Sequence, residues 1–428
     1  MPEATQTGVT RLYLSQNDLL DNQYVRALSY GAYDAASPGE IMRIAADLRG
    51  RPSTRANWIA AWQRQGERAR ELAEAAEAAG HRFTARAAYL RAYNYLRCAE
   101  FYFPRAQPEA HRALYMQSVA CFDKAIALLE TPVQRVDISY IDGISLPGYV
   151  FDPAGAPRGT VIVCGGGDSY GEETYFTAGV PQALERGLRV IAFHGPGQRG
   201  LLHRHPDRVF RPDYEVPIGA VVDFALALPG TDPQRLALYG YSLGGYLAPR
   251  AAACDPRIRA LVANAPMMNF HDFILGGVLT VLPGLLQPVV NRMAENLSDG
   301  VWDWLGERSR AKDWPYDATF ELYMGWTNGV HTFSDYLEAT QRYNLDGLVE
   351  RITCPTLCIS AEGEGPEPIK QTVEFYERLA APKDLITLRI IDGADNHCGM
   401  NNIPHTSALV YDWINDVFDG IRPEPAAA

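Results

Sequence analysis

Apolar residues recur at helical spacing through the first third of the chain. Between residues 17 and 130 they return every three or four positions, and strand-like alternation is scarce. One such run begins at Trp58 and stops at Gly80, a residue typical of helix ends, and another covers residues 85–102. The pattern predicts an all-helical N-terminal domain over residues 1–131.

Short apolar runs bounded by turn residues replace this pattern from residue 133 onward. A hairpin is expected where Asp142 and Gly143 separate two such runs. Six further runs are predicted strands, at residues 159–164, 188–193, 236–241, 258–265, 356–360 and 385–391. Because helical stretches lie between them, the sequence predicts an α/β fold in which helices flank a mostly parallel central sheet. This second domain is expected to cover residues 132–428.

An insertion without clear strands interrupts this alternation at about residues 269–350. Its stretch 274–290 is apolar, but Pro283 and Pro288 lie within it. It falls short of a clean span of about 18 apolar residues, the length that would indicate a membrane helix. We therefore expect a helical cap over the active site and no membrane-spanning segment.

One turn carries the strongest signal for chemistry. Residues 240–244 read Gly-Tyr-Ser-Leu-Gly and lie between an apolar strand and the start of a helix. A turn of this kind raises a serine hydroxyl above the end of a sheet, and its glycines permit a strained backbone. Ser242 is therefore the candidate nucleophile.

The base and the acid that such a serine requires are expected after later strands. A base must take the hydroxyl proton, and a carboxylate must orient that base. His397 follows the last predicted strand, where a histidine loop can return over the serine. Glu364 follows the 356–360 strand and is the first candidate for the acid. Glu362, in the same loop, and Asp272, after the preceding strand, are the alternatives.

The oxyanion of a tetrahedral intermediate requires two backbone donors. The N–H of Leu243, directly after the serine, is one candidate. The other lies in the loop after the 159–164 strand, where Gly166 and Gly167 allow the backbone to approach a substrate closely. Neither of the glycine-rich phosphate-binding motifs is present in this loop.

Together these motifs resemble those of the α/β-hydrolase superfamily. The resemblance extends over nearly the whole chain to the subfamily of 2,6-dihydroxypseudooxynicotine hydrolase, the Ayg1-type fungal polyketide-shortening hydrolases and the FrsA-like proteins. It includes the stretches Gly165-Gly-Gly-Asp-Ser-Tyr-Gly-Glu-Glu, Gly195-Pro-Gly-Gln and Asn396-His-Cys. It implies a triad of Ser242, Glu364 and His397, with no metal ion or organic cofactor. The chain departs from the pattern at His194, where Asp is usual, and in having Glu as the acid.

Composition narrows the function further. The 428 residues carry a net charge of -12, which argues against nucleic acid or an anionic membrane as a main partner. Seven scattered cysteines without zinc-finger spacing, and no visible secretion signal, favour a reduced, cytoplasmic protein. His203 and His205 resemble a metal-binding pair, but no ligand set accompanies them, so a solvated loop is expected. A homodimer is one option for the oligomeric state.

The expected reaction is hydrolysis by a cofactor-free serine enzyme. The substrate would be a bulky, aromatic or polyketide-like metabolite, cleaved at a C–C bond of the 1,3-dicarbonyl type or at an ester or other acyl bond. An acyltransferase, a cyclase or a thioesterase would use the same residues. A non-catalytic ligand-binding protein of the same fold is the alternative from another class. The N-terminal helices and the insertion are expected to roof the active site with some of their aromatic residues, which include Trp58, Trp62, Tyr89, Tyr93, Trp302, Trp304, Tyr323 and Trp326.

Overall fold

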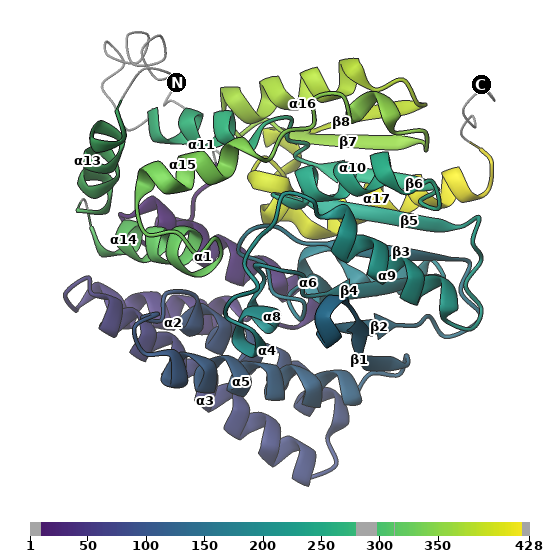
Figure 1. Ribbon diagram of the computed structural model, residues 1–428. Coiled ribbons are helices and arrows are strands. Elements are labelled where there is room, and N and C mark those ends of the chain that lie inside the picture. Colours follow the sequence, from purple (N-terminus) through teal and green to yellow (C-terminus); the bar gives the residue numbers. More distant parts are fainter. Residues whose placement is uncertain (1–9, 280–297, 312, 422–428) are drawn as a thin grey trace.

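An eight-stranded sheet forms the centre of the structure, a computed structural model that describes residues 10–279, 298–311 and 313–421 (Figure 1). The strands are β1 (Val133–Ser139), β2 (Ser145–Phe151), β3 (Gly159–Cys164), β4 (Leu188–Phe193), β5 (Leu236–Tyr241), β6 (Ala260–Asn264), β7 (Thr356–Ala361) and β8 (Lys383–Leu388). They lie in the order β1-β2-β4-β3-β5-β6-β7-β8. The pairs β1–β2 and β2–β4 are antiparallel and all others are parallel, so the predicted α/β fold is confirmed.

Alternate residues of the central strands face two separate cores. Helices α7 (Val180–Glu185), α9 (Glu215–Ala227), α10 (Gly244–Cys254), α16 (Pro366–Arg378) and α17 (Ile403–Phe418) cover the sheet. In β3, Val161 and Val163 join the core that contains α7 and α17. Ile162 and Cys164, which point the other way, join the core that contains α9, α10 and α16. Such burial on both faces is why the central strands are almost continuously apolar.

The N-terminal helices pack against the same face of the sheet as α7 and α17. They are α1 (Asp18–Ser29), α2 (Pro38–Arg49), α3 (Arg55–Ala78), α4 (Arg82–Phe101) and α5 (Pro108–Ala127). Helix α4 lies between α3 and α5, and a side chain on Gly66 of α3 would come within 2.7 Å of Leu96 Cγ on α4. Small residues therefore allow this close packing. Tyr93 of α4 stacks on Phe176 of α6 (Thr174–Thr177), with ring centroids 5.7 Å apart.

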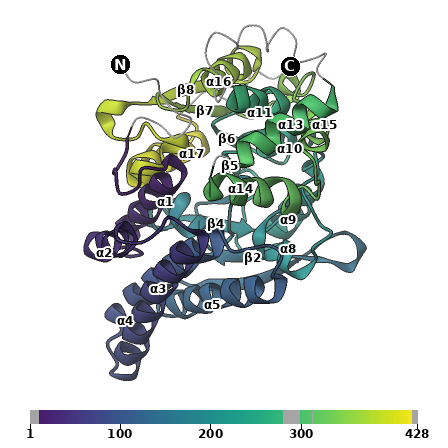
Figure 2. The same ribbon diagram turned by 90° about the vertical axis from the view of Figure 1, so that its left-hand side faces the viewer.

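Helices make up the described part of region 269–350. They are α11 (Phe270–Leu279), α13 (Asp299–Arg310), α14 (Trp314–Phe320), the π-helical segment η4 (Glu321–Trp326) and α15 (Phe333–Gln341). Helix α1 contacts α2 and α4 on one side and α14 on the other (Figures 1 and 2). Within the described residues, no helix is both long and apolar enough to cross a membrane. Of the apolar stretch 274–290, the part from 280 onward lies outside those residues.

Short helical turns complete the secondary structure. They are Tyr30–Tyr33, Ile141–Gly143, α8 (Arg199–Arg204), Val349–Arg351, Ile390–Asp392 and His397–Asn402. The loops after β3, β5, β7 and β8 all leave the carboxyl edge of the parallel strands. Ligands bind at that edge in α/β folds, because loops from neighbouring strands converge there.

Candidate active site

Ser242 lies in a sharp turn between β5 and α10. Its φ angle is 59°, in the left-handed region that a non-glycine residue adopts only under constraint. The constraint is close packing, because a side-chain carbon on Gly240 would lie 2.6 Å from Ala248 Cβ. A side-chain carbon on Gly244 would lie 2.3 Å from the backbone oxygen of Cys164, the last residue of β3. The glycines on both sides of the serine therefore let the strand turn directly into the helix, as the sequence predicts.

His397 and Glu364 meet at the ends of β8 and β7. The Nδ1 atom of His397 lies 3.0 Å from Glu364 Oε1, and the backbone N–H of Cys398 donates to the same oxygen at 3.0 Å. Glu364 is 1% exposed, whereas about a third of the His397 side chain is accessible. Burial lowers the pKa of His397, but the Cys398 sulfur and the Glu364 carboxylate raise it more, so the pKa lies well above its usual value.

The two alternative acids lie elsewhere. Glu362 is exposed and accepts a hydrogen bond from the backbone N–H of Ile390 at 2.6 Å. Asp272 is exposed on α11. Of the three carboxylates considered from the sequence, Glu364 is the one that contacts His397.

The glycine loop after β3 faces the serine. A side-chain carbon on Gly166 would lie 2.6 Å from Ser242 Cβ and 3.3 Å from the backbone nitrogen of Leu243. At Gly167 the same carbon would lie 3.7 Å from Leu243 Cδ2. The three residues considered for an oxyanion hole are thus neighbours around Ser242. Only glycine fits at position 166 without moving the serine.

The stretch that begins at His194, directly after β4, holds the glycine loop by hydrogen bonds. Gln198 donates from Nε2 to the carbonyl of Gly165 at 3.1 Å, and its Oε1 accepts from the N–H of Gly195 at 2.8 Å. His194 Nδ1 accepts from the N–H of Gly200 at 2.9 Å, an acceptor role that a carboxylate could also fill. The unusual histidine is therefore compatible with this turn.

Cys398 contacts both Ser242 and His397. It belongs to the motif Asn396-His-Cys, but the sequence predicted no role for it. Its sulfur accepts from the N–H of Ser242 at 3.2 Å and lies 3.6 Å from His397 Nε2. Its carbonyl accepts from Asn264 Nδ2 at 3.1 Å. Among the described residues, no hydrogen bond joins Ser242 Oγ to His397. Such bonds are often long in free enzymes and tighten when substrate binds.

A cavity of about 430 Å³ lies over these residues and is lined by Ser242, Leu243, Gly167, Asp168, His397 and Cys398 at one end. Helix α1 contributes Leu19 and Arg26, and the end of α4 contributes Phe101 and Tyr102. Region 269–350 supplies a mostly aromatic wall that includes Phe270, Phe320, Tyr323, Phe333 and Tyr336. Of the eight aromatic residues considered for the roof, all within the described chain, only Tyr323 lines this cavity. Trp58, Trp62, Tyr89 and Tyr93 belong instead to the core of the N-terminal helices.

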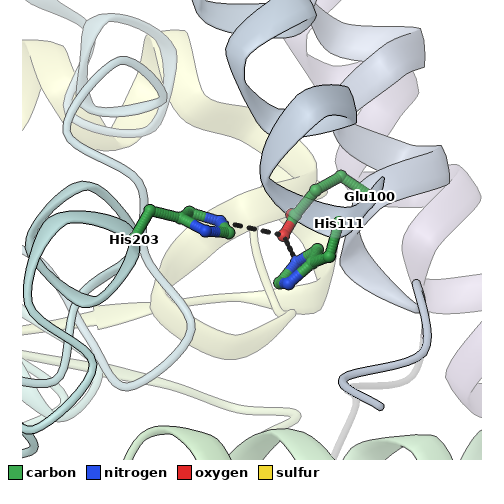
Figure 3. Close-up of side chains that lie close together, drawn as sticks. All are labelled: Glu100, His111 and His203. Carbon is green, nitrogen blue, oxygen red and sulfur yellow. Dashed lines mark hydrogen bonds and ion pairs between the residues drawn. The ribbon is translucent and has the colours of Figure 1, made fainter. Parts of the chain in front are cut away.

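A second carboxylate–histidine cluster is buried between the N-terminal helices and α8. Glu100, His111 and His203 each offer a ligand atom within 4.8 Å of the others (Figure 3). However, Arg105 Nη1 contacts the His111 ring and lies 3.3 Å from Glu100 Oε1, and Arg199 Nε lies 3.7 Å from Glu100 Oε2. Because guanidinium groups already neutralise Glu100, the cluster favours an ionic contact over a metal site.

The prediction of a solvated loop is wrong for His203. This residue lies on α8, and its side chain is only 6% exposed. Tyr115 of α5 stacks on its ring, with centroids 4.5 Å apart. A pairing with a distant helix buries the histidine, and local sequence spacing carries no signal of such a contact.

Comparison with known proteins assigns the chain to a class. Residues 160–407 match the alpha/beta hydrolase family, which is more than half of the chain, so the chain belongs to this family. The resemblance stated from the sequence is confirmed, and the protein is a hydrolase.

Relatives of similar length are found in fungi. The chain is 34% identical to Hydrolase LUC6 of a Fusarium species, covering 94% of this chain and 96% of that protein. It is 30% identical to Alpha/beta hydrolase psoB of Aspergillus fumigatus (97% and 96%) and 35% identical to 20-hydroxy-prefusarin hydrolase FUS2 of Gibberella moniliformis (81% and 82%). Among solved structures, 2,6-dihydroxy-pseudo-oxynicotine hydrolase shares the fold, with a TM-score of 0.69 and 23% identity over 94% of this chain and 98% of that one.

Proposed function

We propose that the protein is a cofactor-free serine hydrolase with a triad of Ser242, His397 and Glu364. The observation that carries this proposal is the arrangement at one end of the cavity. Ser242 and His397 both line the cavity, and Nδ1 of His397 is held 3.0 Å from the buried carboxylate of Glu364. A carboxylate in this position fixes the histidine tautomer whose Nε2 can accept a proton.

The reaction begins with attack of Ser242 Oγ on a substrate carbonyl carbon. His397 Nε2 takes the hydroxyl proton, and Glu364 stabilises the imidazolium that results. The N–H of Leu243 and a backbone N–H at Gly166 or Gly167 stabilise the oxyanion. The leaving group departs with the proton from His397, and water then releases the acid from the acyl-enzyme.

The cavity favours a bulky and largely apolar substrate. Its wall is rich in aromatic side chains. Among the described residues that line it, the charged side chains besides His397 are Arg26 and Asp168, which pair with each other. A C–C bond of the 1,3-dicarbonyl type can be cleaved by the same triad, because the carbon leaving group departs as a resonance-stabilised enolate. The name of the relative that acts on 20-hydroxy-prefusarin supports a metabolite of comparable size. An ester or thioester of such a metabolite is the second substrate class.

The N-terminal helices and region 269–350 together enclose this substrate, as a helical lid and a cap on the catalytic domain. Leu19 and Phe101 come from one side and Phe270 and Phe333 from the other, so neither region alone closes the cavity. Deletion of the N-terminal helices should therefore abolish turnover of the bulky substrate.

A fluorophosphonate probe tests the serine mechanism. Ser242 should be labelled stoichiometrically in the intact protein, and Ser242→Ala should not be labelled. If the intact protein is not labelled, the proposed serine mechanism is wrong. Mass spectrometry of a metabolite trapped on Ser242→Ala would then identify the substrate. Addition of amines or alcohols to the active enzyme would separate hydrolysis from acyl transfer.

A further inference from the structure

The segment that directly follows the oxyanion glycines is held by the N-terminal helices. Four of its six residues, from Asp168 to Glu173, bind residues of α1, α4, α5 or the adjoining turn through their side chains. Asp168 pairs with Arg26, Tyr170 with Glu100, Glu172 with Tyr115, and Glu173 with Arg26, Arg97 and Tyr30. A helical region that served only as a roof would not need to grip this loop.

Arg26 of α1 binds both ends of the segment with one guanidinium group. Its Nη1 donates to Asp168 Oδ2 at 2.6 Å, and its Nε donates to Glu173 Oε1 at 2.9 Å. Its Nη2 donates to the other oxygen of Glu173. Because a guanidinium is planar and carries five donors in fixed directions, it sets the distance between the two carboxylates.

The charges around Arg26 balance inside the protein. Arg26 and Arg97 face Asp168 and Glu173, and Arg97 Nε lies 3.3 Å from Glu173 Oε1. Burial raises the pKa of Asp168, but Arg26 lowers it more, so that the pKa lies below its usual value and the carboxylate is charged. A buried network of paired charges is stiff, since loss of one partner leaves a charge uncompensated.

Asp168, which Arg26 holds, lies two residues after Gly166, the glycine that faces the nucleophile. Gly166 is in contact distance of Ser242, and Gln198 holds the neighbouring carbonyl of Gly165 from the catalytic side. Two residues therefore hold the loop: Gln198, at the start of α8, and Arg26, on the N-terminal helix α1.

We propose that Arg26 is a positioning residue of the reaction, which holds the 165–173 loop so that its backbone N–H groups point at the developing oxyanion. The inference rests on the proposed serine mechanism and extends it. The N-terminal helices contribute to the chemical step itself, in addition to enclosing the substrate. A loop displaced by a fraction of an ångström loses oxyanion stabilisation that the transition state requires.

The test uses the full chain and a substrate too small to need a roof. Arg26→Lys keeps the charge but loses the fork, and Asp168→Asn removes the other partner. With p-nitrophenyl acetate, each should lower kcat about 10-fold to 100-fold and leave KM within about 3-fold. The rate of Ser242 labelling by a fluorophosphonate should fall by a similar factor. The double variant should be no slower than the slower single variant, because the contact that Asp168→Asn removes is already broken in Arg26→Lys.

Arg55→Gln is the matched control. Like Arg26, Arg55 is an arginine of an N-terminal helix that pairs with a distant acid. Its partner is Glu321 of region 269–350, at 2.6 Å, and it has no ion pair with the 165–173 loop in the described structure. It should keep the kcat and the labelling rate of the unchanged protein. The inference is overturned if Arg26→Lys and Asp168→Asn label at the normal rate, or if they raise only KM. If Ser242 of the unchanged protein is not labelled, the serine mechanism fails and the positioning role falls with it.

Discussion

Two carboxylate–histidine clusters among the described residues, Glu364 with His397 and Glu100 with His111, have similar composition but differ in almost every other property. Glu364 and His397 lie beside a cavity, with no arginine among the groups that hydrogen-bond or ion-pair with either of them in the described structure. Glu100 and His111 are buried between helices, and Arg105 and Arg199 face them. The pKa of His397 is raised, whereas burial and Arg105 lower the pKa of His111 to about 3.

This comparison shows that residue type alone does not define a catalytic pair. A histidine can act as a base only if one nitrogen faces a reacting group and its neighbours allow it to carry a proton. His397 meets both conditions, because its ring borders the cavity and a carboxylate supports its charge. His111 meets neither, since its ring is enclosed and a guanidinium repels a proton.

The largest expected effect is on turnover at the cavity cluster. His397→Asn should lower kcat at least about 10⁴-fold, because none of the other residues that the structure describes places a histidine or carboxylate in contact with the serine turn. The variant should remain folded, since the side chain is partly exposed. Steady-state kinetics and thermal unfolding of the same preparation measure both. Retention of more than a tenth of the activity would remove His397 from the mechanism.

The second largest effect is expected for Glu364→Gln, which should lower kcat about 10³-fold or more. The pH profile provides a second reading of the same change. The carboxylate raises the pKa of His397, so its removal should lower that pKa and move the acid limb of the profile to lower pH. Activity depends on neutral His397 and is therefore lost as pH falls through this pKa.

Glu362→Gln is the control for this change. Glu362 is exposed and bonds a backbone amide, so its variant should keep the normal rate and profile. If Glu362→Gln lost more activity than Glu364→Gln, the acid of the triad would lie two residues upstream.

At the buried cluster we expect an effect on stability. Glu100→Gln should lower the free energy of unfolding by about 3–5 kcal/mol, because Arg105 and Arg199 would be left without their counter-charge. Glu74→Gln breaks an exposed pair with Arg70 on α3 and should cost no more than about 0.5 kcal/mol. Urea denaturation compares the two. Equal losses would mean that the buried pairing contributes nothing.

The sequence predicts a region well where short motifs encode it, and poorly where contacts between distant residues form it. The turn at Ser242 and the strands that precede Glu364 and His397 are encoded by short stretches, so the residues that meet at the cavity could be selected in advance. The sequence ranked Glu364 ahead of Glu362 by its distance from the strand end, but the contact of Glu364 with His397 depends on the geometry of the loop. Arg26 and Asp168 lie 142 positions apart, and no spacing rule connects an N-terminal helix to a glycine loop.

Aromatic content was a similarly incomplete guide to the cavity wall. Aromatic residues on α3 and α4 are frequent enough to indicate a roof, yet Trp58 and Trp62 pack on Tyr24 within the helical core. The wall instead uses Phe101 and Tyr102, where α4 ends and its last turn meets α14. Helical periodicity identifies buried positions but does not distinguish a core from a cavity.

The smallest expected effect is a pH dependence that has opposite signs at the two clusters. The pKa of His111 is about 3 in the folded protein and about 6.5 in the unfolded chain, so below pH 6.5 the unfolded chain binds one more proton. Stability is therefore lost as pH falls. Between pH 7 and pH 5 the unchanged protein should lose about 2 kcal/mol more than His111→Asn, measured by urea denaturation at both values. Equal losses would show that His111 is charged in the fold. At His397 the folded pKa is raised, so its stabilisation is present at low pH and lost as pH rises, and His397→Asn should show the reverse difference.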